Sequence, residues 1–216
     1  IKAAEGERQL VSRINPYLVD AADVVMARGS GPLCDVPEMI KGSQPSDGGY
    51  LILSIEEKEE LIQKEPISKN WIREFVGADE FINGYNRWCL WLDGVPPNHL
   101  RDAPLVMQRI QNVRAVRDAS KYAVSIGSNL RPAEFERNRQ PSTDYLLIPS
   151  VSSENRQFVP IGYMPKTTIV SNLVFALPEA TLYHFGMLCS TMHNAWMRTV
   201  AGRLESRYRY SNTIVY

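Results

Sequence analysis

Cysteine and histidine, the usual ligands of transition metals, are scarce in this sequence of 216 residues. The three cysteines (Cys34, Cys89 and Cys189) are odd in number and far apart, which excludes a disulfide framework and a CxxC metal motif. The three histidines have no metal-ligand spacing with one another or with a cysteine. We therefore expect no metal in this segment, and the few cysteines suit a reducing, cytoplasmic location.

Other familiar signals are missing as well. No run of 18 apolar residues is present that could span a membrane, and the first residues do not form a secretory signal. The sequence has no GxGxxG or P-loop motif to hold a phosphate, and no GxSxG turn to present a nucleophilic serine. We therefore expect no catalytic residue in this segment, and we expect that it is not an enzyme by itself.

The composition that remains is that of an ordinary globular protein, with 44% hydrophobic and 22% charged residues. The chain begins with Ile1 instead of Met and ends on the apolar residues Ile214, Val215 and Tyr216. We expect it to be a segment of a longer polypeptide. The short connections between the elements described below predict a single α+β domain.

The formal net charge is zero, but the two signs are unevenly distributed. Residues 1–100 hold 10 Lys and Arg against 16 Asp and Glu, whereas residues 101–216 hold 14 against 8. Such an asymmetry is typical of a binding surface on one side of a molecule, although solvated helices produce it equally well.

The first half of the chain predicts loops followed by short elements. Gly, Pro, Ser and Asp are dense in the first 50 residues, which is typical of loops. A helix is expected at 55–64, because Ser54 and Glu57 form a capping box. A second short helix is expected over residues 68–77. A hairpin is expected around the Asn-Gly pair at 83–84, since Asn-Gly is a strong hairpin signal.

Residues 105–121 predict an amphipathic helix. Its apolar stripe is expected to consist of Leu105, Ile110, Val113 and Val116. The basic side chains of the same segment are expected to project away from that stripe, and they are Arg109, Arg114, Arg117 and Lys121.

The C-terminal half predicts β-hairpins and a twisted sheet packed on a long apolar helix. Residues 145–150 and 156–163 are expected to pair as a hairpin, and residues 167–178 to form a further strand. The long helix is expected over residues 180–202, because Gly202 is a residue favoured just past a helix.

The segment after Gly202 alternates charged and aromatic residues. If it is extended, its period of two places Arg203, Glu205, Arg207 and Arg209 on one face. A Glu beside an Arg has two interpretations. One is a surface ion pair, which contributes about 0–1 kcal/mol. The other is direct reading of a G·C base pair, in which Arg donates to guanine and Glu accepts from cytosine.

Six longer motifs carry a resemblance to a known family. They are INPYLVDAADVV, PLCDVPEMIKGSQPSDGGYLILS, FINGYNRWCLWL, DYLLIPSVSSENRQFVPIGYM, ATLYHFGMLCSTMHNAWMRTVAGRL and YRYSNTIVY. In this order they resemble the C-terminal target recognition domain of the MmeI-like enzymes, which are type IIG/IIL restriction–modification proteins. The resemblance covers residues 14–216, so residues 1–13 are expected to be the link from a methyltransferase domain.

In that family one bacterial polypeptide joins a nuclease, an adenine-N6 DNA methyltransferase and one DNA-reading domain, and some members are methyltransferases only. The resemblance therefore implies that this segment binds double-stranded DNA. It implies that the segment selects the site which the methyltransferase domain of the same polypeptide modifies. S-adenosylmethionine is implied for the whole protein, Mg²⁺ only where a nuclease is fused, and no cofactor for this segment.

The resemblance also implies positions for the residues that read bases. Ser150 departs from the charged residue that the family often has before its Val-Ser-Ser-Glu motif, and its partner position falls at Asn172. The base pair read by these two residues is therefore not predicted. The positions that match the family's readers are Ser150, Asn172, Leu173, Glu205, Arg207 and Arg209.

Further basic residues are expected to contact DNA phosphates, which position a protein on the duplex without reading its sequence. A solvated side chain is the alternative for each of them. These residues are Arg114, Arg117, Lys121, Arg131, Arg137, Arg139 and Arg156.

Two other functions remain open at this point. A protein-interaction or scaffold domain would use the Arg-rich face to bind an acidic partner. A specificity module like those of separate type I subunits is the other, although a second recognition domain and long spacer helices are missing. Because a scaffold has no reason to distinguish DNA duplexes, sequence preference separates these functions.

Overall fold

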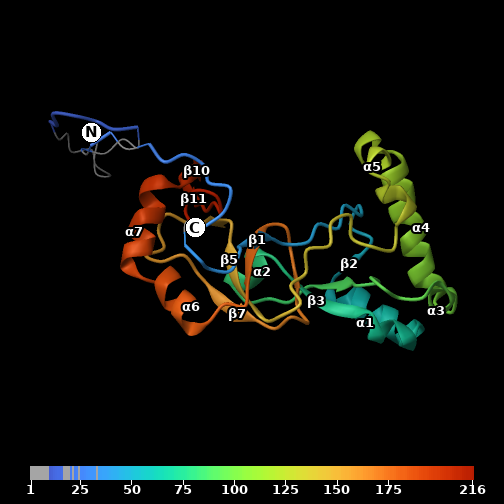
Figure 1. Ribbon diagram of the computed structural model, residues 1–216. Coiled ribbons are helices and arrows are strands. Elements are labelled where there is room, and N and C mark those ends of the chain that lie inside the picture. The colour runs from blue at the N-terminus through green and yellow to red at the C-terminus, as the bar shows by residue number, and fades with distance from the viewer. Residues whose placement is uncertain (1–9, 17–19, 21, 24, 33) are drawn as a thin grey trace.

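The computed structural model describes residues 10–16, 20, 22–23, 25–32 and 34–216. Within them the chain forms three small sheets, with helices at both ends of the molecule (Figure 1). The expected α+β class is confirmed. Residues 1–9 of the expected link lie outside the described residues, as do residues 17–19, 21 and 24 of the first motif.

One end of the molecule is built on a four-stranded sheet in the order β2-β4-β3-β8. Its neighbouring strands are antiparallel, except that β3 and β8 are parallel. The strands are β2 (Ile52–Leu53), β3 (Ile72–Val76), β4 (Trp88–Leu90) and β8 (Ile169–Val170).

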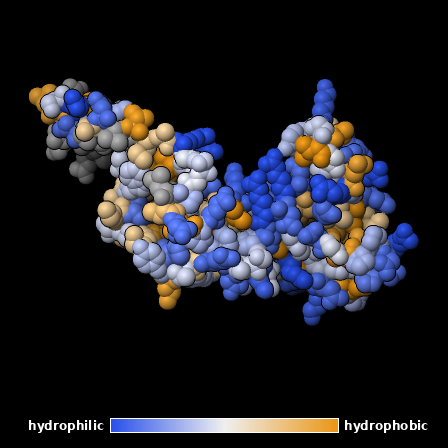
Figure 2. Space-filling model, in the orientation of Figure 1, coloured by the Kyte–Doolittle hydropathy of each residue, from blue (hydrophilic) through white to orange (hydrophobic). Residues whose placement is uncertain are grey.

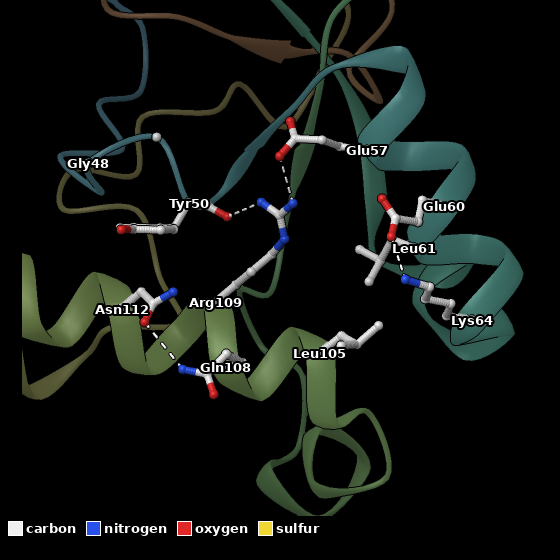
Figure 3. A pocket seen from close by; sticks show the side chains of 11 residues that line it. Gly48, Tyr50, Glu57, Glu60, Leu61, Lys64, Leu105, Gln108, Arg109 and Asn112 are labelled. Carbon is white, nitrogen blue, oxygen red and sulfur yellow. Dashed lines mark hydrogen bonds and ion pairs between the residues drawn. The ribbon is translucent and has the colours of Figure 1, made fainter.

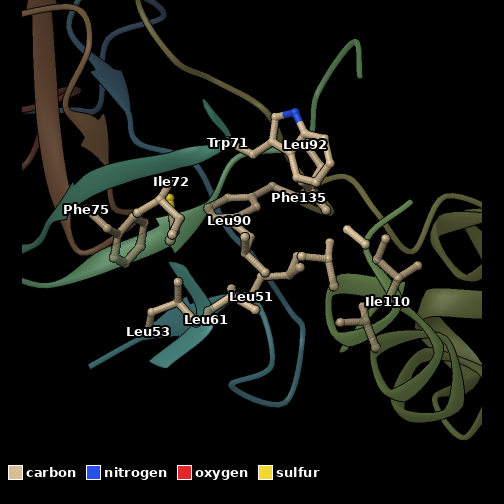
Figure 4. Close-up of a cluster of buried hydrophobic side chains, with 14 of the residues drawn as sticks. Leu51, Leu53, Leu61, Trp71, Ile72, Phe75, Leu90, Leu92, Ile110 and Phe135 are labelled. Carbon is tan, nitrogen blue, oxygen red and sulfur yellow. The ribbon is translucent and has the colours of Figure 1, made fainter. Parts of the chain in front are cut away.

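Helices surround this sheet, and α4 and α5 extend away from it as an arm, here called the α4–α5 arm (residues 104–125; Figure 1). Buried side chains of the sheet and of α1 and α4 form one continuous apolar core (Figure 4). The helices are α1 (Ile55–Lys64), η1 (Pro66–Asn70), α2 (Ala78–Asn83), α3 (Pro97–Arg101), α4 (Pro104–Asp118), α5 (Lys121–Ser125) and η2 (Ser128–Leu130).

The other end holds two further sheets and two helices. An antiparallel sheet in the order β1-β9-β5-β7 packs against α6 and α7, and a small sheet in the order β10-β11-β6 lies beside it. The elements are β1 (Ile40–Lys41), β5 (Tyr145–Pro149), β6 (Val151–Ser152), β7 (Gly162–Met164), β9 (Val174–Pro178), α6 (Leu182–Leu188), α7 (Thr191–Val200), β10 (Gly202–Leu204) and β11 (Arg207–Arg209).

The two ends give the molecule a concave side. Figure 2 shows the surface hollowed between the end that carries β10 and β11 and the α4–α5 arm, and the surface in this hollow is mostly hydrophilic. No described helix is both long and apolar enough to cross a membrane.

The capping box expected at the start of α1 is confirmed. The Ser54 hydroxyl accepts from the Glu57 N–H at 3.2 Å, and the Glu57 carboxylate accepts from the Ser54 N–H at 2.9 Å. These two bonds satisfy donors that a helix start leaves without partners, so the local sequence is sufficient to place this end.

The segment before residue 77 was expected to be a helix and is a strand, and the segment after it was expected to be a strand and is a helix. The expected helix at 68–77 is wrong, because Ile72–Val76 is the central strand β3. The expected hairpin at 83–84 is wrong as well, because Gly84 ends helix α2 with a φ of +71°. An Asn-Gly pair fits a hairpin turn and a helix C-terminus equally, since both need a positive φ. Here the Glu80 carboxylate accepts from the Gly77 N–H at 2.8 Å and selects the helix.

The long apolar helix expected at 180–202 is two helices. The Ser190 hydroxyl accepts from the His193 N–H at 3.1 Å and starts α7. The amide of the buried Asn194 donates to the Ser190 carbonyl at 2.9 Å and to the Leu188 carbonyl at 3.4 Å. These bonds turn the chain between α6 and α7, so two short helices cover the sheet.

The remaining strand predictions are confirmed in part. β5 and β7 pair with Leu146 opposite Tyr163, but the chain between them is longer than expected and contributes β6 to another sheet. The expected strand at 167–178 is divided into β8 and β9, which belong to different sheets. The residues between them, Ser171, Asn172 and Leu173, form a turn.

Candidate nucleic-acid interface

The segment after Gly202 is a hairpin and not one extended strand. β10 and β11 pair antiparallel, and Glu205 and Ser206 make the turn between them. Because a turn reverses the chain, the period of two does not continue across it. The expectation that four charged residues share one face is therefore wrong.

The pairing of the hairpin decides which charges share a face. Arg203 lies opposite Tyr208, and its guanidinium stands 4.3 Å from the centre of the Tyr208 ring. Directly paired residues point to the same side of a sheet. Arg207 and Arg209 therefore share one face, and Arg203 lies on the other face with Tyr208.

Glu205 has a backbone φ of +58°, a value that residues other than glycine seldom adopt. A positive φ at the first of two turn residues is the pattern of a type II′ turn, in which glycine is preferred. Holding a glutamate there costs about 1–3 kcal/mol, and such strained residues cluster at functional sites. Ser46 and Glu179 are the other described residues besides glycine with a positive φ.

Two contacts fix this turn from either side. The Arg203 guanidinium donates to the Ser206 carbonyl at 2.8 Å. The Ser206 hydroxyl donates to Glu154, and this bond holds the pKa of the Glu154 carboxyl below its usual range. The turn is therefore held in place by these two contacts, although it is exposed to solvent.

Glu205 and Arg207 form an ion pair in the free chain. The Arg207 guanidinium donates to the Glu205 carboxylate at 2.9 Å, and 47% and 78% of the two side chains are exposed. An ion pair this exposed contributes about 0–1 kcal/mol, so both groups separate readily when a better partner arrives. Their proximity also means that both side chains can reach one small target.

Ser150 links the hairpin to the turn at 171–173. Its hydroxyl and its N–H both donate to the Leu173 carbonyl, at 2.5 and 3.3 Å. Its own carbonyl accepts from the Tyr210 N–H at 2.9 Å, directly after Arg209. Ser150, Leu173 and Arg209 are thus brought side by side, although 59 residues of sequence separate the first from the last.

The turn at 171–173 is held against the residues that follow β1. The Asn172 N–H donates to the Ser43 carbonyl at 2.9 Å. A Cβ atom on Gly42 would lie 2.2 Å from the Ser171 carbonyl oxygen, so only glycine fits at this close approach. Asn172 is half-buried, whereas Leu173 is 58% exposed. Leu173 is therefore the side chain of this turn that is most accessible to a partner.

The buried Tyr210 and the half-buried His193 form a pair next to the hairpin. Tyr208 packs against the core of this end and Tyr210 is part of it. The Tyr210 hydroxyl lies 2.9 Å from His193 Nε2. Burial lowers the pKa of His193 and raises the pKa of Tyr210, so the pair is neutral at pH 7.

Arg117, which the sequence placed on the outside of α4, is only 1% exposed. Its guanidinium donates five hydrogen bonds of 2.7–3.0 Å, all to backbone carbonyls. Burial lowers its pKa. A side chain committed in this way cannot reach a phosphate, so the phosphate role expected for Arg117 is wrong. The buried stripe of α4 consists of Val106, Ile110, Val113 and Arg117.

The other six candidates for phosphate contact are exposed. Arg114 pairs with Asp118 at 3.7 Å, and Arg131 with Glu134 at 3.3 Å. The Arg137 guanidinium donates to the Tyr122 hydroxyl at 2.6 Å. Lys121, Arg139 and Arg156 have no side-chain hydrogen bond or ion pair with another described residue.

Besides the concave side of the molecule, the surface has a pocket of about 490 Å³ between α1 and α4 (Figure 3). Its centre is occupied by Arg109, which donates to the Glu57 carboxylate at 2.8 Å and to the Tyr50 carbonyl at 3.0 Å. Glu60 and Lys64 pair on its rim. Because its charges are already satisfied by one another, this pocket has little attraction for a charged ligand.

Arg28 and Lys41 lie beside the hairpin and were not singled out from the sequence. Both line a hollow together with Ser150, Arg203 and Arg209. Each is an isolated basic residue in a loop or a short strand, which gives no periodic signal. Among the described residues, no group of three or more His, Cys, Asp or Glu side chains is placed to hold a metal ion.

Comparison with known proteins shows which family the chain belongs to. Residues 20–216 match the family described as "MmeI, target recognition domain". A solved structure of the type IIL restriction–modification enzyme MmeI in complex with DNA superposes with a TM-score of 0.92 and 48% identity, over 95% of this chain and 28% of that chain. DNA methyltransferase A of Bacillus subtilis (strain 168) is 36% identical over 209 residues, which are 97% of this chain and 24% of that protein.

The chain thus spans about a quarter of the length of these two relatives. The family match covers most of the chain, and the similarity to MmeI extends to the fold. The chain belongs to the MmeI target recognition domain family.

Proposed function

We propose that this chain is the DNA-reading domain of a restriction–modification methyltransferase and that it docks in the major groove of duplex DNA. Membership in a target recognition family and the DNA bound in the similar MmeI structure support this. The observation that carries it is the braced hairpin, which presents Glu205 and Arg207 together on an exposed turn in spite of the backbone cost.

In this proposal Glu205 and Arg207 read one G·C base pair. Arg207 donates two hydrogen bonds to guanine O6 and N7, and Glu205 accepts one from the cytosine N4 amino group. Each such contact discriminates against the wrong base by about 1–3 kcal/mol. The 2.9 Å between the two side chains supports a shared target, since bases of one pair are adjacent.

Ser150, Asn172, Leu173 and Arg209 form the second reading region of the proposal. Their support is the set of backbone bonds through Ser150 that places them beside the hairpin. Leu173, as the exposed apolar side chain, suits contact with a thymine methyl group. Arg209 suits guanine, because it has no partner among the described residues.

Phosphate contacts complete the interface. They position the domain without reading sequence, and they make binding sensitive to salt. The exposed residues proposed for this role are Arg114, Lys121, Arg131, Arg137, Arg139 and Arg156.

We further propose residues 14–216 as the recognition domain and residues 1–13 as the link to a methyltransferase domain of the same polypeptide. That domain would bind S-adenosylmethionine and methylate adenine N6 after flipping the base out of the duplex. Mg²⁺ would be needed only if a nuclease is fused as well. The two relatives, a restriction–modification enzyme and a DNA methyltransferase, support this organisation.

A charge swap in the full-length protein tests the reading pair. Glu205→Lys combined with Arg207→Asp should exchange a preferred C·G pair for G·C at one position of the site. Sequencing of methylated sites gives the preference directly. Unchanged sites with intact activity would show that the assignment is wrong.

The control is another exposed ion pair, Glu60 with Lys64 on α1. Swapping it by Glu60→Lys and Lys64→Glu should leave the methylated site as it is. A protein-interaction scaffold is the competing function, and it would show no preference among duplexes in either variant or in the native protein.

A further inference from the structure

A hollow of about 490 Å³ lies beside the hairpin and is here called the hairpin hollow. Its described lining residues include no Asp or Glu. Four of them are basic, and they are Arg28, Lys41, Arg203 and Arg209.

Three of these four cations have no ion-pair partner among the described residues. Arg203 is engaged with Ser206 and Tyr208, but Arg28, Lys41 and Arg209 make no side-chain hydrogen bond or ion pair with any described residue. Like charges that converge without a counter-ion repel one another in the free protein. An anion that enters between them relieves this repulsion, so the hollow is electrostatically prepared for a negative group.

The backbone around the hairpin hollow is fixed before any ligand arrives. Lys41 lies in β1, paired with Phe175 of β9. The N–H of Gly29, next to Arg28, donates to the Thr213 carbonyl at 2.8 Å. The Asn212 amide donates to the Met39 carbonyl at 2.9 Å and joins the same wall to β1. The segments that carry the cations are thus held in place by the fold.

Neutral donors line the same wall. The hydroxyls of Ser211 and Thr213 lie 3.1 Å apart and both belong to the hairpin hollow. Serine, threonine, arginine and lysine side chains all contact phosphate oxygens in DNA complexes. Carboxylates, which phosphates avoid, are absent from the described lining.

We infer that the hairpin hollow binds one phosphate of the DNA backbone, with Arg28 and Lys41 as its cations. This inference rests on the proposed DNA-reading function. Neither residue is among those proposed to read a base or to contact a phosphate elsewhere. The bound phosphate would fix the duplex next to Ser150 and Arg209, which line the same hollow and are proposed to read bases.

Salt dependence tests the charge of the contact. The DNA-binding constant K falls as salt rises, and each lost phosphate contact makes the slope of log K against log salt less steep by about 0.9. Between about 50 and 200 mM salt, a variant that lacks one contact should therefore lose about 3.5-fold less affinity than the native protein. Arg28→Gln and Lys41→Gln, each in the full-length protein, should show this change and keep the native methylated site. Lys69→Gln, an exposed lysine of η1, is the control and should show neither effect.

Neutralising single phosphates locates the contact. Methylphosphonate is placed at each backbone position of the site in turn, and affinity is measured for the native protein and for Lys41→Gln. One position should weaken the native protein more than it weakens Lys41→Gln, because the variant has already lost one of the two cations that contact this phosphate. Additive losses at every position would overturn the inference.

Two other results would also overturn it. A changed base preference in Lys41→Gln would make Lys41 a base reader. If inorganic phosphate binds in the hairpin hollow and both variants keep the native affinity for DNA, the hollow is a site for free anions and not for a DNA phosphate. If the native protein shows no preference among duplexes, the proposed function itself fails, and this result is distinct from the others.

Discussion

Three arginines of the α4–α5 arm and three cations beside the hairpin of β10 and β11 differ in whether their side chains have partners. On the arm, Arg117 is buried with five carbonyl partners, and Arg109 and Arg114 are paired with carboxylates. At the hairpin end, Arg28, Lys41 and Arg209 have no partners among the described residues. A basic residue therefore indicates binding only after its existing partners are known.

The physical reason is the cost of removing a charge from water. A buried guanidinium is tolerated when its donors are satisfied, and Arg117 satisfies all five of its N–H groups with backbone carbonyls. It joins residues 45–46, the helix η2 with Arg131, and Glu134 to α4. An exposed cation without such bonds keeps its attraction for an external anion.

The largest effect is expected from Arg117→Met. Methionine fills part of the volume but leaves five carbonyls without this donor, one of them in a buried hydrogen bond and four in part-buried ones, and each buried group without a partner costs about 1–3 kcal/mol. We expect a loss of about 3 kcal/mol or more in the free energy of unfolding, measured by urea denaturation. Arg114→Met, on the exposed face of the same helix, should change it by less than about 0.5 kcal/mol. Equal effects would remove the distinction between the two arginines.

The next effect concerns specificity. Arg207→Ala in the full-length protein should reduce discrimination at one position of the site by about 1–3 kcal/mol, or roughly 5- to 150-fold in relative methylation rate. Competition between substrates that differ at this base pair measures it. Arg198→Ala serves as a control, because Arg198 is tied to the carbonyls of Arg156 and Gln157. A uniform loss over all positions would indicate a phosphate contact at Arg207.

A smaller effect is expected at the turn, where one substitution should raise stability and lower base discrimination. Glu205→Gly relieves the positive φ and should stabilise the hairpin by about 1 kcal/mol, while it lowers discrimination at the same base pair. Urea denaturation and the competition assay measure the two results. Ser206→Gly is the control, since Ser206 has no positive φ and should gain no stability. A Glu205→Gly variant that is less stable than the native protein would show that the backbone at Glu205 is not strained.

The smallest effect concerns pH. Burial lowers the pKa of His193, so the unfolded chain binds a proton that the folded chain resists. The stability from this residue is complete above the unfolded pKa of about 6.5 and is lost as the pH falls below it. Between pH 7 and pH 5, the midpoint of thermal unfolding should fall less in His193→Gln than in the native protein. Parallel curves would show that His193 is not responsible.

Parts of the fold follow from local sequence. Ser54 and Glu57 place the start of α1, because both partners of the capping box lie within one turn. The Asn83-Gly84 pair predicted a positive φ correctly and the element type wrongly. The stripe at 106, 110, 113 and 117 has helical spacing and could have identified Arg117 as buried, but a charged residue argues against burial until its partners are seen.

The candidate site follows from the sequence in one respect only. Alternating charges after Gly202 drew attention to Glu205 and Arg207, and the ion pair between them is present. The turn between β10 and β11, the face of Arg203, and the junction of Ser150 with Leu173 and Tyr210 were not predictable. They depend on hydrogen bonds between segments far apart in sequence.

The sequence by itself determined the family, the α+β class, the start of helix α1 and the residues around which the candidate site is built. Those features depend on residue identity and on contacts within one turn of chain. The tertiary structure decided which arginines are buried, which are paired and which converge on the hairpin hollow. Burial and pairing depend on distant segments, since solvation and Coulomb interactions act through space and not along the chain.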